Sequence, residues 1–256
     1  MKNILLDIKK NVFTPTAILS VLLALLMFSE KLVNIEIGYY SYGDLISYCY
    51  LFTPFIVFAP IISSATGSST VCDDIKNGYI KYMLIRMSKE NYTINKFISG
   101  IFSGGIVMAF SSSVLAIIIL ILGVPIGKDY NSTLNGPFDG TAFESIQYLS
   151  GGLIVIIVTI VLSFIFGAIW SGVGIAFSVY TSNKYLAIVF PLILYYSMNM
   201  LFLKFDVLLK FSPWYTIIPG TTSIKNLSFI FTEQLFFLLI IFFAYYLGAE
   251  VKLKNV

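Results

Sequence analysis

Few side chains in this chain of 256 residues could do acid–base or metal chemistry. The sequence contains no histidine, which is the commonest metal ligand and a frequent general base in proteins. Its two cysteines, Cys49 and Cys72, are too few for a zinc or iron–sulfur centre. Zinc proteases and Ser-His-Asp hydrolases are therefore excluded in their usual form. We expect no catalytic residue and no metal site, and we do not expect an enzyme.

The chain also lacks a nucleotide-binding loop. The nearest string runs from Gly123 to Lys128, is one residue shorter than the phosphate-binding pattern, and is followed by Asp129. It ends an apolar run, whereas a true phosphate loop links a strand to a helix. If ATP acts on this protein, we expect ATP and Mg²⁺ to bind a partner chain, so that this chain holds no cofactor.

One carboxylate lies inside an apolar run, at Glu233. Acidic residues within the membrane often mark proton or ion pathways. Glu233 has no partner base in its run, and a single acid makes a poor proton relay. We expect a structural role for it, and the scarcity of such acids argues against an ion-coupled transporter.

Residues 67–97 form the most informative polar segment. The pattern of residues 81–87 is helical, and Ser88 can cap a new helix that continues into the next apolar run. A short helix at a membrane face can dock into a groove of a partner protein. The basic residues of the segment could equally rest on anionic lipid. Periodicity alone leaves both interpretations open.

The elements that position Glu233 and the segment 67–97 are six long apolar runs. They lie at residues 16–32, 45–66, 98–123, 149–173, 185–203 and 229–248. A helix needs about 20 apolar residues to cross the hydrocarbon of a bilayer. The chain is 58% hydrophobic and 11% charged, whereas soluble domains carry about 25% charged residues. We expect an all-α membrane protein with six transmembrane helices in a single transmembrane domain over residues 1–256. The spacing of Gly100 and Gly104 predicts a close helix approach in the third span.

Lysine and arginine predict the orientation, because basic loops tend to stay cytoplasmic. With both ends inside, the inner segments hold 11 of these residues and the outer segments hold 5, which together make the 16 in the chain. We therefore expect both termini in the cytoplasm. Residues 1–13 have a helical period that separates Ile4, Leu5 and Ile8 from the lysines, which favours an amphipathic helix lying in the inner interface. The net charge of +3 does not suggest nucleic acid.

A resemblance to a known family rests on the order of several short motifs. They are Asp73-Asp74, Gly78, Leu84, Ser88-Lys89 and Lys96 in the first cytoplasmic loop, Ser178, Asn183-Lys184 and Ala187 around the second, and Ser212-Pro213 in the last outer loop. This order resembles that of type-2 ATP-binding-cassette exporter permeases, in particular the small permeases of peptide, lantibiotic-immunity and bacitracin-type exporters. The chain departs from the family at Tyr79 and Met87, where threonine and proline are usual.

The resemblance implies a dimer of permease copies, or of a copy and a sibling, each bound to a separate ATPase subunit. In the coupling loop 67–97, the segment 73–87 would form a coupling helix that contacts the ATPase. The implied coupling residues are Asp73, Asp74, Gly78, Tyr79, Tyr82, Met83, Arg86, Ser88 and Lys89. The expected function is the export of amphipathic or antimicrobial peptides across a bacterial cytoplasmic membrane. Drug or antibiotic resistance or immunity is the alternative cargo class within the family.

The resemblance also implies a conduit between the second and fifth spans, where the candidates are Tyr48, Thr53, Phe55, Tyr195, Tyr196 and Asn199. The outer segment 204–228 is unusually apolar for a loop. We expect it to form two short re-entrant helices broken at Pro213 and Pro219, with Trp214 at the interface, as an outer gate.

Two functions of other classes stay open. A substrate-capture subunit of a vitamin importer would also have six helices and would bind a small ligand without an ATPase. A non-transport membrane protein, such as an assembly or immunity factor, would show no ATP-dependent flux.

Overall fold

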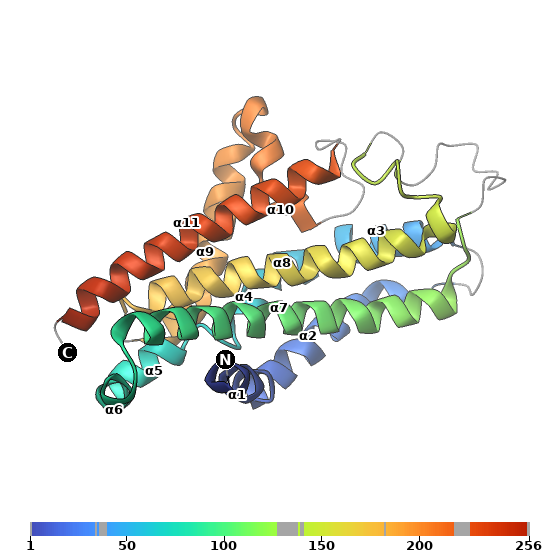
Figure 1. Cartoon of the computed structure of the whole chain (residues 1–256). Helices are drawn as coiled ribbons and strands as arrows, with labels where there is room; N and C mark the ends of the chain where they lie inside the picture. Colours follow the sequence, from blue (N-terminus) through green and yellow to red (C-terminus); the bar gives the residue numbers. More distant parts are fainter. Residues whose placement is uncertain are drawn as a thin grey trace.

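The regular structure of this protein is helical. The structure is a computed structural model that describes residues 2–33, 35, 40–126, 138, 141–181, 183–217 and 226–254. In chain order its helices are α1 (Lys2–Val12), α2 (Pro15–Leu32), α3 (Tyr42–Leu51), α4 (Phe55–Ser64), α5 (Thr70–Lys76), α6 (Tyr79–Arg86), α7 (Lys89–Leu122), η1 (Leu149–Gly152), α8 (Leu153–Ser178), α9 (Lys184–Phe202), η2 (Asp206–Phe211), α10 (Pro213–Ile217) and α11 (Leu227–Lys254). Figure 1 shows α7, α8 and α11 running side by side along the bundle.

Five helices in the described residues are long and apolar enough to cross a membrane. They are α2, α7, α8 together with η1, α9 and α11, and the count rises to six if the bent pair α3 and α4 forms one span. A chain with this many apolar helices is a multi-pass membrane protein, because each can satisfy its backbone hydrogen bonds within lipid.

The predicted second span, residues 45–66, is not one straight helix. It consists of α3 and α4, which meet at an angle of 75°. Pro54 lies at the break, and a proline both lacks a backbone N–H and disfavours the helical conformation of the residue before it. A capping box of Ser41 and Asp44 fixes the start of α3. The apolar run 45–66 therefore folds as a broken pair of helices.

The predicted third span is longer than residues 98–123. Helix α7 begins at Lys89 and has 34 residues, because Ser88 caps its first turn and residues 89–97 continue the helix. About 20 helical residues suffice to cross the hydrocarbon. Helix α7 therefore extends beyond one span, toward the end of the bundle where α5 and α6 lie (Figure 1).

Helices α7 and α8 form the centre of the bundle and approach closely at small residues. A Cβ atom added to Gly104 would lie 2.8 Å from the carbonyl oxygen of Gly167 and 2.8 Å from that of Ser63. One turn away, the Ser171 hydroxyl donates to the Gly100 carbonyl at 2.9 Å. This geometry confirms the close approach predicted from the glycine spacing, since small residues let membrane helices pack backbone to backbone.

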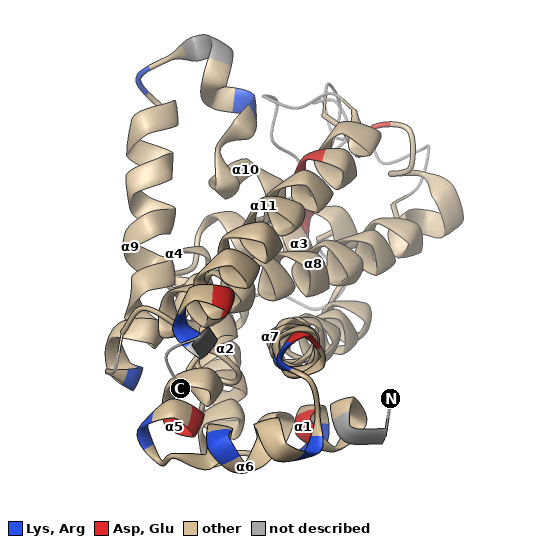
Figure 2. Cartoon of the chain, turned by 60° about the vertical axis from the view of Figure 1, so that its left-hand side comes forward, with Lys and Arg blue, Asp and Glu red and all other residues tan. Residues whose placement is uncertain are grey.

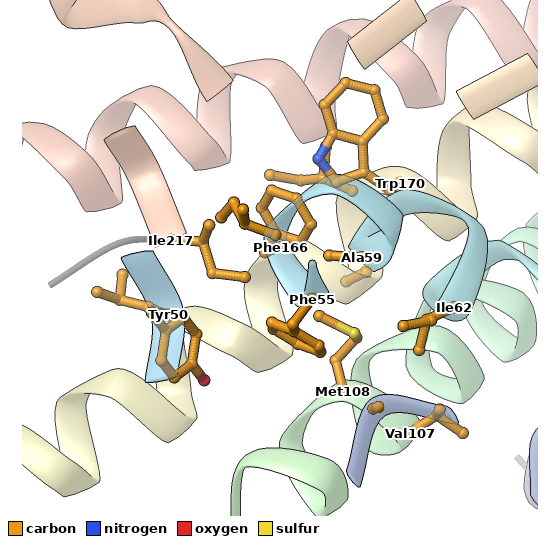
Figure 3. Packing of buried hydrophobic residues seen from close by; sticks show 14 of the residues in the cluster. Tyr50, Phe55, Ala59, Ile62, Val107, Met108, Phe166, Trp170 and Ile217 are labelled. Atoms are coloured by element: carbon orange, nitrogen blue, oxygen red, sulfur yellow. The ribbon is translucent and has the colours of Figure 1, made fainter. Parts of the chain in front are cut away.

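Large side chains fill the space around this contact. Figure 3 shows Phe55 and Ala59 of α4 packed with Met108 of α7 and Phe166 of α8. The hydroxyl of buried Tyr50 forms hydrogen bonds of 2.7 Å with Ser112 of α7 and 2.7 Å with Ser163 of α8. The broken helix pair is thus held against the centre of the bundle by both apolar packing and a buried polar network.

Replacing Gly104 by Val should push α7 away from α8 and α4, because the new side chain would collide with backbone atoms. Overpacking of this kind costs about 1–3 kcal/mol. We expect a lower midpoint of thermal unfolding for the purified protein in detergent. The control is Ile117→Ala on the same helix, where the side chain is 58% exposed; an equal midpoint for Gly104→Val and the native protein would contradict the close contact.

Candidate functional site

Two short helices, α5 and α6, lie across one end of the bundle. Figure 2 shows them beside α1, with lysine and arginine residues grouped around them. Gly78 joins them in a left-handed conformation with φ of 66°, which glycine adopts without steric cost. Met87 is extended, and the Ser88 hydroxyl accepts the backbone N–H of Asn91 at the start of α7. The predicted cap at Ser88 and the helix near 81–87 are confirmed, whereas the segment 73–87 forms two helices instead of one.

Helix α6 has an inner face that anchors it to the bundle. Ile80 is buried and packs with Tyr92 of α7, and Met83, Leu84 and Met87 cover this small cluster. The cluster is separate from the main core. Burial of these side chains holds α6 against the first turn of α7 by the hydrophobic effect.

The outer face of α6 carries large apolar side chains without cover in this chain. Tyr79 is 50% exposed, Tyr82 is 68% exposed and Ile85 is 83% exposed. Their spacing of three residues places them along one side of the helix. Lys81 and Arg86 are exposed beside them. An apolar strip with a basic rim, at the end of a membrane bundle, is typical of a surface that a partner covers.

A buried cluster of charges lies beneath the two short helices. The Lys96 Nζ atom is 3.0 Å from the Asp74 Oδ2 atom and 3.5 Å from the Asp7 Oδ2 atom. The Tyr92 hydroxyl donates to the same Asp74 oxygen at 2.8 Å. Lys96 itself is only 8% exposed. We call these four residues the Lys96 cluster; they come from α1, α5 and α7.

The Lys96 cluster fixes three elements to one another. A buried ammonium needs compensating charge, because the desolvation of an unpaired ion is costly. Asp74 and Asp7 supply that charge to Lys96 from two different helices. The N-terminal helix and the α5–α6 pair are therefore attached to α7 by the same cation.

The two neighbouring acids Asp73 and Asp74 point to different partners. Asp74 belongs to the Lys96 cluster. Asp73 lines a polar cleft of about 550 Å³ together with Lys76 of α5 and with Asn183 and Lys184 at the start of α9. The structure thus brings the first and second family-like motifs together at one end of the bundle, although they are about a hundred residues apart in the sequence.

The remaining predicted coupling residues lie around a second cleft. Tyr79, Met83 and Arg86 line it from α6, facing Leu6 and Asp7 of α1. Ser88 and Lys89 are exposed at the start of α7.

Sequence analysis missed Asp7 and Tyr92. The spacing of Tyr92 could have predicted its contact with Lys96, because Tyr92 lies four residues before Lys96 and residues four apart share a helix face. Asp7 lies on the polar side of the amphipathic pattern of residues 1–13, but nothing local in the sequence links it to Lys96.

Most of the predicted conduit residues fill the core of this chain. The rings of Phe55 and Phe28 pack at a tilt with their centroids 4.3 Å apart, and the ring centroids of Tyr195 and Trp170 lie 5.2 Å apart. Thr53 and Asn199 are also buried, at 5% and 4% exposure. Cargo could reach these four only after the helices separate, so their contact with cargo stays a prediction.

The other two conduit candidates are more accessible. Tyr48 is 44% exposed, and Tyr196 is partly buried at the edge of the core. Both also stay predictions, since exposure on a membrane helix can equally mean contact with lipid.

The predicted outer gate is partly described. The short helices η2 and α10 flank Ser212, as expected for a break at Pro213, and Pro219 lies outside the described residues. The Asn199 carboxamide oxygen accepts the backbone N–H of Trp214 at 3.2 Å and the Ser212 hydroxyl. This attaches α10 to α9, while entry of the segment into the membrane stays a prediction.

The described residues contain no group of three or more His, Cys, Asp or Glu side chains that could hold a metal ion. Cys49 and Cys72 are both buried and free. Burial raises the pKa of the Cys72 thiol, because the charged thiolate loses its hydration. Neither of these two thiols is therefore presented to solvent.

In comparisons with known proteins, no family model, no curated protein and no solved structure matches this chain.

Replacing Lys96 by Met should strongly destabilise the protein, because Asp74 and Asp7 would stay near each other without a counter-charge. Removing one partner of a buried pair typically costs about 3–5 kcal/mol. Asp74→Asn should also destabilise, and the double variant should lose less than the sum of the two single losses. Unfolding midpoints of the four proteins in detergent give this coupling.

The matched control is Lys9→Met, at an exposed position of α1. It should leave the midpoint nearly unchanged. Additive losses in the double variant, or a native midpoint for Lys96→Met, would show that the Lys96 cluster does not hold the three helices together.

Proposed function

We propose that this chain is the transmembrane permease subunit of an ATP-driven exporter, in which a separate ATPase docks on α6. The observation that carries the proposal is the exposed strip of Tyr79, Tyr82 and Ile85 on a helix whose other face is anchored to α7. A partner that covered this strip would remove apolar area from water, and such burial is the main driving force of association.

The position of the strip supports transmission of force. Helix α5 is attached through Asp74 to Lys96, and Lys96 lies on α7. A displacement of the α5–α6 pair by a partner is therefore passed to α7 and, through Asp7, to α1. Transport by such a protein requires two discrete packings of rigid elements, between which a partner shifts the equilibrium.

The source of energy follows from what the sequence lacks. The chain has no phosphate-binding loop, so ATP and Mg²⁺ belong to the partner subunit. The resemblance in motif order supports a pair of permease copies, or a copy and a sibling, around one exit path. It also supports amphipathic peptides as cargo and a bacterial cytoplasmic membrane as location. Export of drugs or antibiotics is the alternative within the same family.

The distribution of charge supports a cytoplasmic position for both termini. Helix α1, the α5–α6 pair and the end of α11 lie toward one end of the bundle (Figure 1). The lysine and arginine residues of these segments make that end basic, as is usual for the cytoplasmic side. With six spans, the bent pair α3 and α4 counts as one of them.

A photo-crosslinking amino acid in place of Ile85 should capture the ATPase in the native membrane, because this side chain is the most exposed of the strip. Purification of the captured complex should yield ATP hydrolysis. The same probe in place of Ile117, which is exposed on the transmembrane part of α7, should capture no ATPase.

The substitution Tyr82→Asp should lower the co-purified ATPase activity by about tenfold or more, as expected for loss of a central aromatic contact. Tyr180→Asp is the matched control, since Tyr180 is 66% exposed and lies outside α6. An ATPase that still binds after Tyr82 and Ile85 are both replaced by Asp would refute docking on α6. Absence of both an ATPase and ATP-dependent flux in proteoliposomes would favour a non-transport membrane protein.

Orientation can be measured with single cysteines in a chain whose Cys49 and Cys72 are replaced by Ala. A maleimide that does not cross membranes should label Lys210→Cys on intact cells. It should label Lys81→Cys only after the cells are opened, because α6 faces the cytoplasm in this proposal. The opposite labelling pattern would place α6 outside the cell, beyond the reach of a cytosolic ATPase.

A further inference from the structure

An apolar cavity lies at a different place in the fold, between α8, α9, α10 and α11. This cavity has a volume of about 230 Å³. Its walls are apolar and partly aromatic, and they include Phe166, Trp170, Leu194, Met198, Phe237 and Ile241. For comparison, an engineered apolar cavity of about 150 Å³ binds benzene. The space therefore admits a ring with a short alkyl arm.

A carboxylate without a partner lines this cavity. Glu233 is 6% exposed, and neither of its carboxylate oxygens has a hydrogen-bond partner among the described residues. Buried polar groups in native proteins are nearly always hydrogen-bonded, and the exceptions call for an explanation such as a ligand. A purely structural role, expected from the sequence, gives no such explanation because a structural carboxylate would bond to the chain.

The adjacent side chain adds a third acceptor. The Gln234 Nε2 atom donates to the Thr216 carbonyl oxygen at 3.3 Å, which fixes the orientation of the amide, since a carbonyl can only accept. The Gln234 Oε1 atom is then left buried and without a partner. The Thr216 hydroxyl already donates to the Pro213 carbonyl oxygen. Glu233 and Gln234 both line the cavity, and together they carry three buried acceptor oxygens without a hydrogen-bond partner among the described residues.

We propose that this cavity is a binding site for a hydrophobic primary amine. The protonated amine has three N–H donors, which match the three free oxygens of Glu233 and Gln234. Its charge would be compensated by the Glu233 carboxylate in a charge-assisted hydrogen bond. Trp170 and Phe166 in the walls suit an aromatic or branched body.

The lining selects against two other occupants. A metal ion prefers several oxygen ligands of which more than one is charged, and the cavity offers a single carboxylate. A zwitterionic lipid headgroup carries a phosphate, and none of the described residues that line the cavity is a lysine or arginine that could accept it. The site belongs to one chain and does not depend on an ATPase, so it stands apart from the proposed transport function.

Tryptophan fluorescence provides a direct readout. The sequence has two tryptophans, Trp170 and Trp214. Trp170 lines the cavity, and Trp214 follows Pro213, another lining residue. The test titrates the purified full chain in nanodiscs at neutral pH with 4-phenylbutylamine and, separately, with 4-phenylbutanol, which has the same shape without the charge.

The amine should cause a saturable change and bind at least about tenfold more tightly than the alcohol, because only the amine pairs with a buried carboxylate. In Glu233→Gln, a nearly isosteric change, this preference should disappear while the affinity for the alcohol stays within about twofold. Glu30→Gln is the matched control at an exposed position of α2, and it should keep the native preference.

A second arm identifies the source of the amine. Phenylalaninamide with a free amino group and its N-acetyl form are added as competitors of 4-phenylbutylamine. Competition by the free form alone would support the site and extend it to peptide N-termini, whereas competition by neither would support a site for small amines.

Two results would overturn the proposal. One is equal binding of the amine and the alcohol by the native chain, a comparison that needs no variant to fold. The other is a preference for the amine that persists in Glu233→Gln. Failure of ATPase docking at α6 would leave both measurements unaffected.

Discussion

A single buried ammonium organises one end of this molecule. Lys96 receives its counter-charges from Asp74 and Asp7, which lie on two different helices. Because an unpaired charge at this depth is costly, the three helices can move only in ways that keep these groups together. The exposed strip on α6, the start of the longest helix and the N-terminal helix therefore behave as one unit. In the proposed function, a partner docked on α6 would act on the bundle through this unit.

The local features of the structure could be predicted from the sequence. Ser88 was predicted as a helix cap because a hydroxyl before a helical pattern satisfies free backbone N–H groups. Pro54 accounts for the break in the second apolar run, although the angle of 75° could not be derived from it. The spacing of Gly100 and Gly104 predicted where helices approach closely. Each of these features depends on a few neighbouring residues.

The candidate site was less predictable, since its key contacts join distant parts of the chain. Nothing near Asp7 in the sequence indicates a contact with Lys96, which lies on another helix. The burial of Phe55 and Tyr195 could not be predicted from the sequence either. Membrane helices are apolar on every side, so hydrophobic periodicity does not separate the face toward the core from the face toward lipid.

Helix α7 differs from the broken pair α3 and α4 in having no interruption over its 34 residues. At 1.5 Å per residue it is a rod about 51 Å long. Lys96, which pairs with Asp7 of α1 and Asp74 of α5, lies near its N-terminal end, and the helix contains no proline. If α7 tilts by one degree about its N-terminal end, its C-terminal end moves by roughly 0.9 Å, because the helix is about 51 Å long. Small angular changes on one side of the membrane are thus magnified into shifts of several ångströms on the other.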